Sequence, residues 1–166
     1  MSIESALEEV REVISPYLTE GIFTAYDHEG YAKGRRTPRV YLHALRPPEL
    51  NESDEEYLGS VYPFIVLKPT GGEASVNGVD SSWNGIRVTA VIGICAPGED
   101  MQGNRDVSAI IDRILQAVGE NPYTKHCRFS DEIDWQIDDE AEHPYYYGTV
   151  SLTVYDRLTT RAEYDI

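Results

Sequence analysis

Residues 131–155, DEIDWQIDDEAEHPYYYGTVSLTVY, contain two segments in which apolar and polar side chains alternate. A period of two residues is typical of a β-strand with one buried face. The first segment places Ile133, Trp135 and Ile137 on one face, and we expect these three in the core. The second segment follows Pro144, and its two faces are Tyr146, Val150, Leu152 and Val154 against Tyr145, Tyr147, Thr149, Ser151 and Thr153. The stretch therefore predicts two strands and leaves the acids and tyrosines of the other face to be explained.

Further strands are predicted on the N-terminal side of this stretch. Residues 85–95 (GIRVTAVIGIC) alternate most clearly and are expected to form the central strand. Residues 39–45 and 61–68 are also strand candidates, and residues 18–26 are expected to contain a short strand. Residues 70–83 (TGGEASVNGVDSSW) are rich in turn-forming residues, so a loop is predicted there.

Two helices are predicted, because apolar residues recur at helical spacing from Ile3 to Ile14 and over residues 105–118. The fold class that follows is α+β. We expect a mainly antiparallel mixed sheet with two helices packed on one face, plus a β-rich or loop-rich insertion near residues 20–60. Within that insertion, residues 51–56 are expected to be a polar linker or a short helical turn.

One domain is expected over residues 1–158, because a chain of 166 residues can bury a substantial core. It would include a basic arm or loop at about residues 27–39 and be followed by a polar C-terminal tail at residues 159–166. Two cysteines are too few for a disulfide framework, which indicates synthesis in a reducing cytoplasm. No stretch approaches the roughly 20 apolar residues of a membrane helix, so no membrane partner is expected.

The net charge of −15 comes from 29 acidic and 14 basic residues. Such a surface repels phosphate backbones, so sequence-specific binding of nucleic acid is not expected. The charge is also uneven. Seven acids and no base lie between Asp131 and Glu142, and five basic residues occupy one short segment: Lys33, Arg35, Arg36, Arg39 and Arg46. Two interpretations stay open, a solvated surface and complementary patches that meet between neighbouring subunits.

No motif for catalysis, a cofactor or a metal is found. Carboxylates and an imidazole at Asp134, Asp138 and His143 could bind a divalent ion, but the spacing of a calcium loop is missing. His126 beside Cys127 does not make a catalytic dyad, because adjacency in sequence is not contact in space. Phosphate-binding loops, G-x-S-x-G, HExxH and CxxC are also absent.

Tyr145 and Tyr147 fall on the strand face that the core does not need. Tyrosine combines a large apolar area with a polar tip, which suits protein interfaces. A solvated, tyrosine-rich sheet face is the alternative interpretation.

The second half of the chain, roughly residues 60–158, resembles a family of phage proteins. These are the tail terminator (tail-completion) proteins of long-tailed bacteriophages and the related minor tail and neck proteins. The resemblance is carried by the segments YPFIVLKP (62–69), GIRVTAVIGICAPGED (85–100), NRDVSAIIDRILQAV (104–118), EIDWQIDDE (132–140) and HPYYYGTVSLTV (143–154).

The resemblance implies a homo-oligomeric ring, expected to be a hexamer, in the tail-neck region of the virion. The ring would cap the tail tube protein, terminate tail polymerisation and present a joining surface to the head-completion or neck protein. Genome DNA would pass through an acidic lumen without specific binding, and neither catalytic residues nor a cofactor would be present. The candidate subunit-interface residues are Arg35, Arg36, Arg39, Asp134, Asp138, Asp139, Tyr145 and Tyr147.

Two alternatives to this function stay open. Within the assembly proteins, the chain could be a neck or head-tail connector subunit. From another class, it could be an acidic metal-dependent enzyme or binding domain that uses Asp134, Asp138 and His143.

Overall fold

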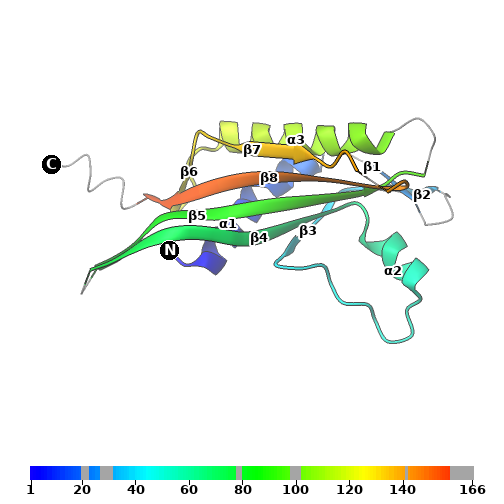
Figure 1. Cartoon of the computed structure of the whole chain (residues 1–166), viewed down its shortest axis with the longest axis horizontal. Helices are drawn as coiled ribbons and strands as arrows, with labels where there is room; N and C mark the ends of the chain where they lie inside the picture. The colour runs from blue at the N-terminus through cyan, green and yellow to red at the C-terminus, as the bar shows by residue number, and fades with distance from the viewer. Residues whose placement is uncertain (20–22, 27–31, 78–79, 98–101, 141, 158–166) are drawn as a thin grey trace.

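The computed structural model describes residues 1–19, 23–26, 32–77, 80–97, 102–140 and 142–157 (Figure 1). In this part of the chain it has three helices, a curled six-stranded mixed sheet and a separate two-stranded sheet. The predicted α+β fold class is therefore confirmed.

The elements follow one another along the chain in a mixed order. They are α1 (Ile3–Leu18), β1 (Phe23–Tyr26), β2 (Ala32–Arg36), β3 (Arg39–Leu42), α2 (Asp54–Val61), β4 (Phe64–Asn77), β5 (Asp80–Cys95), α3 (Gln102–Glu120), β6 (Cys127–Phe129), β7 (Asp134–Ile137) and β8 (Tyr145–Asp156).

The large sheet has the strand order β3-β4-β5-β8-β6, and β7 also pairs with β8. The β3–β4 pair is parallel, and the other pairs are antiparallel. At one level of the sheet the strands β3, β4, β5, β8 and β7 lie side by side, so β3 and β7 form opposite edges. The predicted central strand, residues 85–95, lies within β5 between β4 and β8, which confirms that prediction.

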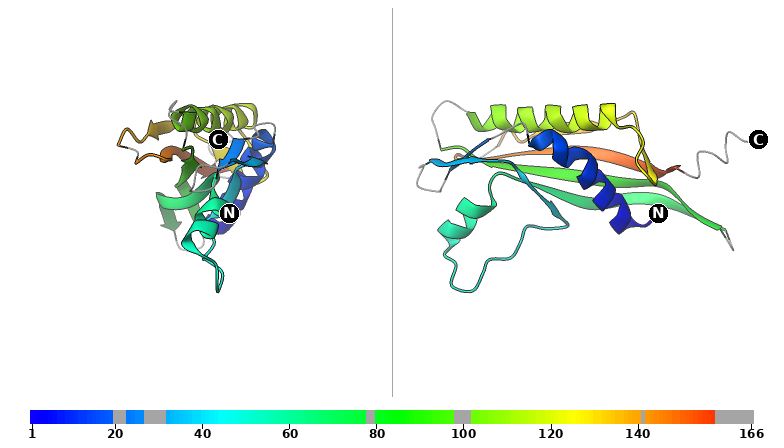
Figure 2. Two further views of the ribbon diagram at one scale, coloured as in Figure 1. Left: turned by 90° about the vertical axis from the view of Figure 1, so that its right-hand side faces the viewer. Right: turned by 180° about the vertical axis from the view of Figure 1, so that it is seen from behind.

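Helices α1 and α3 pack on the same face of this sheet (Figure 2). We call it the inner face. Alternate residues of the central strands, such as Ile92 on β5 and Val150 on β8, are fully buried there against Leu7 and Ile14 of α1 and Ile114 of α3. This arrangement confirms two helices on one face, because the periodicities of both helices and both strands converge on one core.

The opposite face, which we call the outer face, carries a second and smaller cluster beside α2. Its buried residues are Val61, Tyr62, Phe64, Val66 and Cys95. The helix α2 was predicted only as a linker or short turn. It is a helix of eight residues that ends at Val61, and its first turn is stabilised by Ser53, which forms a reciprocal capping box with Glu56.

The predicted loop at residues 70–83 is wrong, because β4 continues to Asn77 and β5 begins at Asp80. The two strands form one long antiparallel hairpin that projects beyond the helices (Figure 1). Gly71 and Gly72 are accommodated by irregularities in the register, at φ values of 153° and 155° that favour glycine. Turn-forming residues therefore mark bulges here and not a loop.

The predicted basic arm at residues 27–39 is only partly described. Residues 27–31 lie outside the described part of the chain. Residues Ala32–Arg36 form β2, which pairs antiparallel with β1, and Arg39 begins β3, so these portions are strands and not a loop. The expected tail at residues 159–166 also lies outside the described residues.

Candidate functional site

Five of the eight candidate interface residues belong to the outer face of the large sheet. Strand alternation places them there, because the intervening residues of β3 and β8 face the helices. They are Arg39, Asp134, Asp138, Tyr145 and Tyr147. Asp139 is exposed in the turn that follows β7. Arg35 is opposite Thr24 in the small sheet, and its side chain lies outside the described part of the structure.

Arg39 and Asp138 occupy the two ends of one row across the sheet. Along this row Arg39 is opposite Phe64, Phe64 opposite Gly93, and Gly93 opposite Tyr147. The backbone N–H of Asp138 then donates to the Tyr147 carbonyl at 3.0 Å. Four strand spacings, or roughly 19 Å along the sheet, separate the backbones of the two residues, so the two side chains do not pair within one chain.

An open cavity of about 270 Å³ lies beside Asp138 at the β7 edge. Its lining residues are Gln136, Asp138, Tyr147, Gly148 and Thr149. The Asp138 carboxylate accepts a hydrogen bond from the Glu140 backbone N–H at 3.0 Å. The structure therefore brings two of the predicted site residues, Asp138 and Tyr147, together around one hollow.

The two outer-face tyrosines are half-buried by contacts within the chain. The ring of Tyr62 lies 5.3 Å from that of Tyr145 and 6.4 Å from that of Tyr147, and the hydroxyls of Tyr62 and Tyr147 are hydrogen-bonded. Burial, followed by this hydrogen bond, raises the pKa of Tyr62. Contacts within the chain therefore account for much of the burial of Tyr145 and Tyr147, with no need for a second protein. Tyr147 also lines the hollow beside Asp138.

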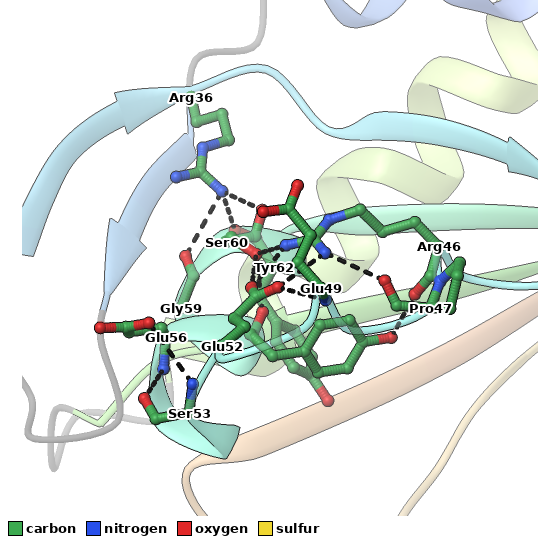
Figure 3. Close-up of polar contacts among 11 residues, drawn as sticks. Arg36, Arg46, Pro47, Glu49, Glu52, Ser53, Glu56, Gly59, Ser60 and Tyr62 are labelled. Atoms are coloured by element: carbon green, nitrogen blue, oxygen red, sulfur yellow. Dashed lines mark hydrogen bonds and ion pairs between the residues drawn. The ribbon is translucent and has the colours of Figure 1, made fainter.

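The side chain of Arg36 is hydrogen-bonded within its own chain, at the C-terminal end of α2 (Figure 3). Its Nη1 donates to the carbonyls of Ser60 at 2.6 Å, Tyr62 at 3.0 Å and Gly59 at 3.4 Å. A cation suits this position because the last carbonyls of a helix lack partners and carry partial negative charge. Burial lowers the pKa of Arg36. The sequence grouped Arg36 with Arg39, but the structure gives Arg36 a role in holding β2 against α2.

Arg46 also binds within the chain, and it fixes the loop between β3 and α2 (Figure 3). Its guanidinium meets Glu52 in a two-point contact with N–O distances of 2.7 and 3.0 Å, and it lies over the ring of Tyr57. The Arg46 hydrogen bonds, followed by the backbone N–H of Glu49, lower the pKa of Glu52 from 4.5 to about 2. Of the described basic residues in this segment, Arg39 therefore remains the candidate for an external partner.

A Glu52→Gln variant is expected to lose stability only where the Glu52 carboxylate is ionised. The folded-state pKa lies below the ordinary value, so the contribution is complete above about pH 4.5 and disappears as the pH falls towards 2. Melting temperatures of the variant and the parent, measured from pH 7 to pH 2, should therefore converge at low pH. Glu8→Gln on the exposed side of α1 is the matched control, and a Glu52 difference that stays constant with pH would contradict the assignment.

The acids of the β7 region do not form a metal site in the described part of the structure. No group of three or more His, Cys, Asp or Glu side chains there is close enough to hold an ion. His143 instead approaches Tyr146, whose hydroxyl lies 2.9 Å from Nδ1. The residues of the metal alternative, Asp134, Asp138 and His143, are therefore not gathered into a ligand set.

Cys127 lies in the core and is held as a thiol. Its side chain is fully buried, and its sulfur contacts a Glu9 carboxylate oxygen at 3.4 Å. Burial and the nearby Glu9 charge raise the pKa of Cys127 to about 12. The Nδ1 atom of His126 lies 3.4 Å from Oε2 of the same Glu9 carboxylate. Because a thiolate is the nucleophilic form of cysteine, this environment does not activate Cys127.

The prediction that Trp135 belongs to the core is wrong, since its exposed fraction is 58%. Trp135 is directly opposite the fully buried Val150, so its direction was predicted correctly. It is exposed because β7 is an edge strand at the margin of the cover that α3 provides. With Ile133, Leu115 and Val118, it lines an open hollow of about 410 Å³.

Trp135→Ala is expected to lower the free energy of unfolding by only about 1–2 kcal/mol. A buried aromatic residue typically costs about 3–5 kcal/mol on truncation, and more than half of Trp135 is already in water. Phe129→Ala, on the neighbouring β6 with an exposed fraction of 4%, should show the larger loss. Urea unfolding of dilute protein gives both values, and equal losses would place Trp135 in the core after all.

Comparisons with known proteins add no family assignment: the chain matches no protein-family model, and the search of curated proteins returns no significant relative. In the part of the chain that the structure describes, none of the helices has the length and apolar character needed to span a bilayer.

Proposed function

We propose that this protein is a structural virion component of a long-tailed phage that forms a homo-oligomeric ring on the end of the tail tube. The ring terminates tail polymerisation and offers a joining surface to a head-completion or neck protein. The proposal starts from the resemblance over residues 60–158 and is supported by the arrangement of charge on the large sheet.

The observation that carries the proposal is that the sheet has two open edges of opposite charge. Among the described strands, β3 pairs only with β4, and β7 pairs only with β8. Exposed Arg39 is on the first edge, and the exposed acids Asp134 and Asp138 are on the second. A ring is built from head-to-tail contacts, which require two different and complementary patches on each subunit. This chain carries both patches on one sheet.

The overall charge is compatible with a passage for DNA. A net charge of −15 per subunit disfavours adhesion of the phosphate backbone to the lumen of a ring. A neck or connector ring would have the same property, so binding to tail tubes is the observation that separates these two assembly roles.

Size-exclusion chromatography with light scattering tests the self-assembly directly. A hexamer of 18.7 kDa subunits has a mass of about 112 kDa, six times the subunit mass. We expect that mass, or another closed ring, either for the protein alone or after addition of purified tail tubes. A chain that stays monomeric under both conditions would overturn the proposal.

A further inference from the structure

We propose that the β3 edge of one copy pairs with the β7 edge of the next, with Arg39 seated in the hollow formed by Asp138 and Tyr147. The inference rests on the proposed ring function and specifies the contact from which the ring is built. The partner at this surface is therefore a second copy of the same chain.

The hollow at the β7 edge has the chemistry of a guanidinium site. Asp138 supplies a carboxylate, Tyr147 supplies an aromatic side chain, and Gln136 and Thr149 supply further polar atoms. A guanidinium can pair with a carboxylate and stack on an aromatic ring at the same time, which an ammonium does less well. The site therefore fits an arginine in particular.

Arg39 is the arginine placed to enter that hollow from a neighbouring copy. It is exposed and lies on the outer face at the opposite edge. Within the described part of the chain, no acidic side chain forms an ion pair with it. Arg36 and Arg46, by contrast, are bound to α2 and to Glu52.

The strand directions allow a regular ladder between copies. β3 is parallel to β4, and three successive antiparallel pairings lead from β4 through β5 and β8 to β7. β7 therefore runs opposite to β3. Rotation about a ring axis that runs roughly parallel to the strands keeps the strand direction the same in every copy. In such a ring, β7 of one copy and β3 of the next meet as an antiparallel pair.

The register of this pair follows from the rows of the sheet. Without any shift along the strands, the opposing residues are Arg39 with Asp138, Val40 with Ile137, Tyr41 with Gln136, and Leu42 with Trp135. On the outer side the opposite charges of Arg39 and Asp138 face each other and Tyr41 faces Gln136, while on the inner side all four opposing side chains are apolar. A slip of one residue would place apolar residues opposite charged ones. The register also covers the exposed ring of Trp135.

The backbone groups agree with the same register. The N–H of Arg39 donates to the carbonyl of Pro63, just before β4, and the N–H of His43 donates to that of Leu67 in β4. By alternation, the N–H groups of Val40 and Leu42 point outward. The N–H of Asp138 donates to β8, so those of Ile137 and Trp135 point outward. In an antiparallel pair, every second pair of directly opposite residues exchanges both backbone hydrogen bonds. Val40 and Ile137, which lie opposite each other and both point outward, form such a pair in this register.

Charge exchange tests the contact. Arg39→Glu and Asp138→Arg are each expected to raise the concentration for half-assembly at least 100-fold, because like charges then oppose each other. The combined variant should return to within about 10-fold of the parent. Lys68→Glu, an exposed reversal on the outer face of the interior strand β4, is the matched control and should assemble normally. Circular dichroism should show that all four variants melt like the parent.

A disulfide test gives an independent readout. Val40→Cys combined with Ile137→Cys should form bonds between copies under oxidation, giving a ladder on a non-reducing gel, and each single variant should give none. The native Cys95 and Cys127 are buried and do not compete. If the parent assembles but neither reversal has an effect and no ladder forms, the β3–β7 contact is wrong while the proposed ring remains supported.

A parent that stays monomeric would contradict both the contact and the ring. Reversals that weaken binding to tail tubes without affecting self-assembly would overturn the β3–β7 contact and assign the hollow to another protein.

Discussion

Ile114→Asp is expected to abolish the cooperative unfolding transition of the protein at 25 °C. Ile114 on α3 is fully buried in the core that α1 and α3 form with the inner face of the large sheet. Aspartate at this position would lose the apolar contacts and bury a carboxyl group without a partner, at a cost of more than about 5 kcal/mol. That loss is comparable with the whole stability of a typical domain.

The matched control for Ile114→Asp is Gln116→Asp, because Gln116 is exposed two residues further along the same helix. The same side chain is then introduced into water, with an expected loss of about 1 kcal/mol or less. Circular dichroism in increasing urea distinguishes the two variants. A native-like transition for Ile114→Asp would show that the core does not lie between the helices and the sheet.

Tyr146→Ala has the second largest expected effect, a loss of about 3–5 kcal/mol in the free energy of unfolding. Tyr146 has an exposed fraction of 1% and is the largest of the fully buried side chains in the described structure. Its ring packs on Gly103 so closely that a Cβ atom at Gly103 would overlap it. Truncation would therefore leave a large cavity between β8 and the start of α3.

Tyr146→Phe separates packing from hydrogen bonding at this position. It keeps the ring on Gly103 and removes the hydroxyl that lies 2.9 Å from His143 Nδ1, so a loss of only about 1 kcal/mol is expected. Urea unfolding measures both variants. Equal losses for Ala and Phe would mean that the hydroxyl, and not the packed ring, stabilises this end of the sheet.

Strand alternation correctly predicted which face of the sheet a side chain occupies, but it predicted the degree of burial less well. Tyr146 and Val150 are buried and Tyr147 is turned to the other face, as the period of two residues indicated. Trp135 also faces the predicted side but is exposed, because an edge strand reaches the margin of the helix cover. Period alone cannot reveal an edge, since strand order depends on contacts distant in sequence.

Glycines gave the least reliable prediction of local structure. Gly71 and Gly72 suggested a loop, yet both lie in β4, where their positive φ values accommodate irregular pairing with β5. Turn signals and bulge signals use the same residue types, and the pairing partner decides between them. The short helix α2 was predicted only as one of two alternatives for residues 51–56, and its end at Val61 was not predicted, because eight residues give little helical periodicity.

The candidate site was predicted as a set of charges and not as a geometry. Arg36 and Arg39 are equivalent in the sequence, but only tertiary contacts show that Arg36 binds the end of α2. That Arg39 and Asp138 share one row depends on the order β3-β4-β5-β8-β7 and on a parallel β3–β4 pair. Neither feature can be read from the alternation of single strands.

Electron microscopy of the purified protein mixed with growing tail tubes tests the central claim most directly. We expect a ring of this protein on one end of each tube and tubes that stop elongating once the ring is bound. Tubes that elongate unchanged, with bare ends and a monomeric protein in solution, would contradict the proposed function.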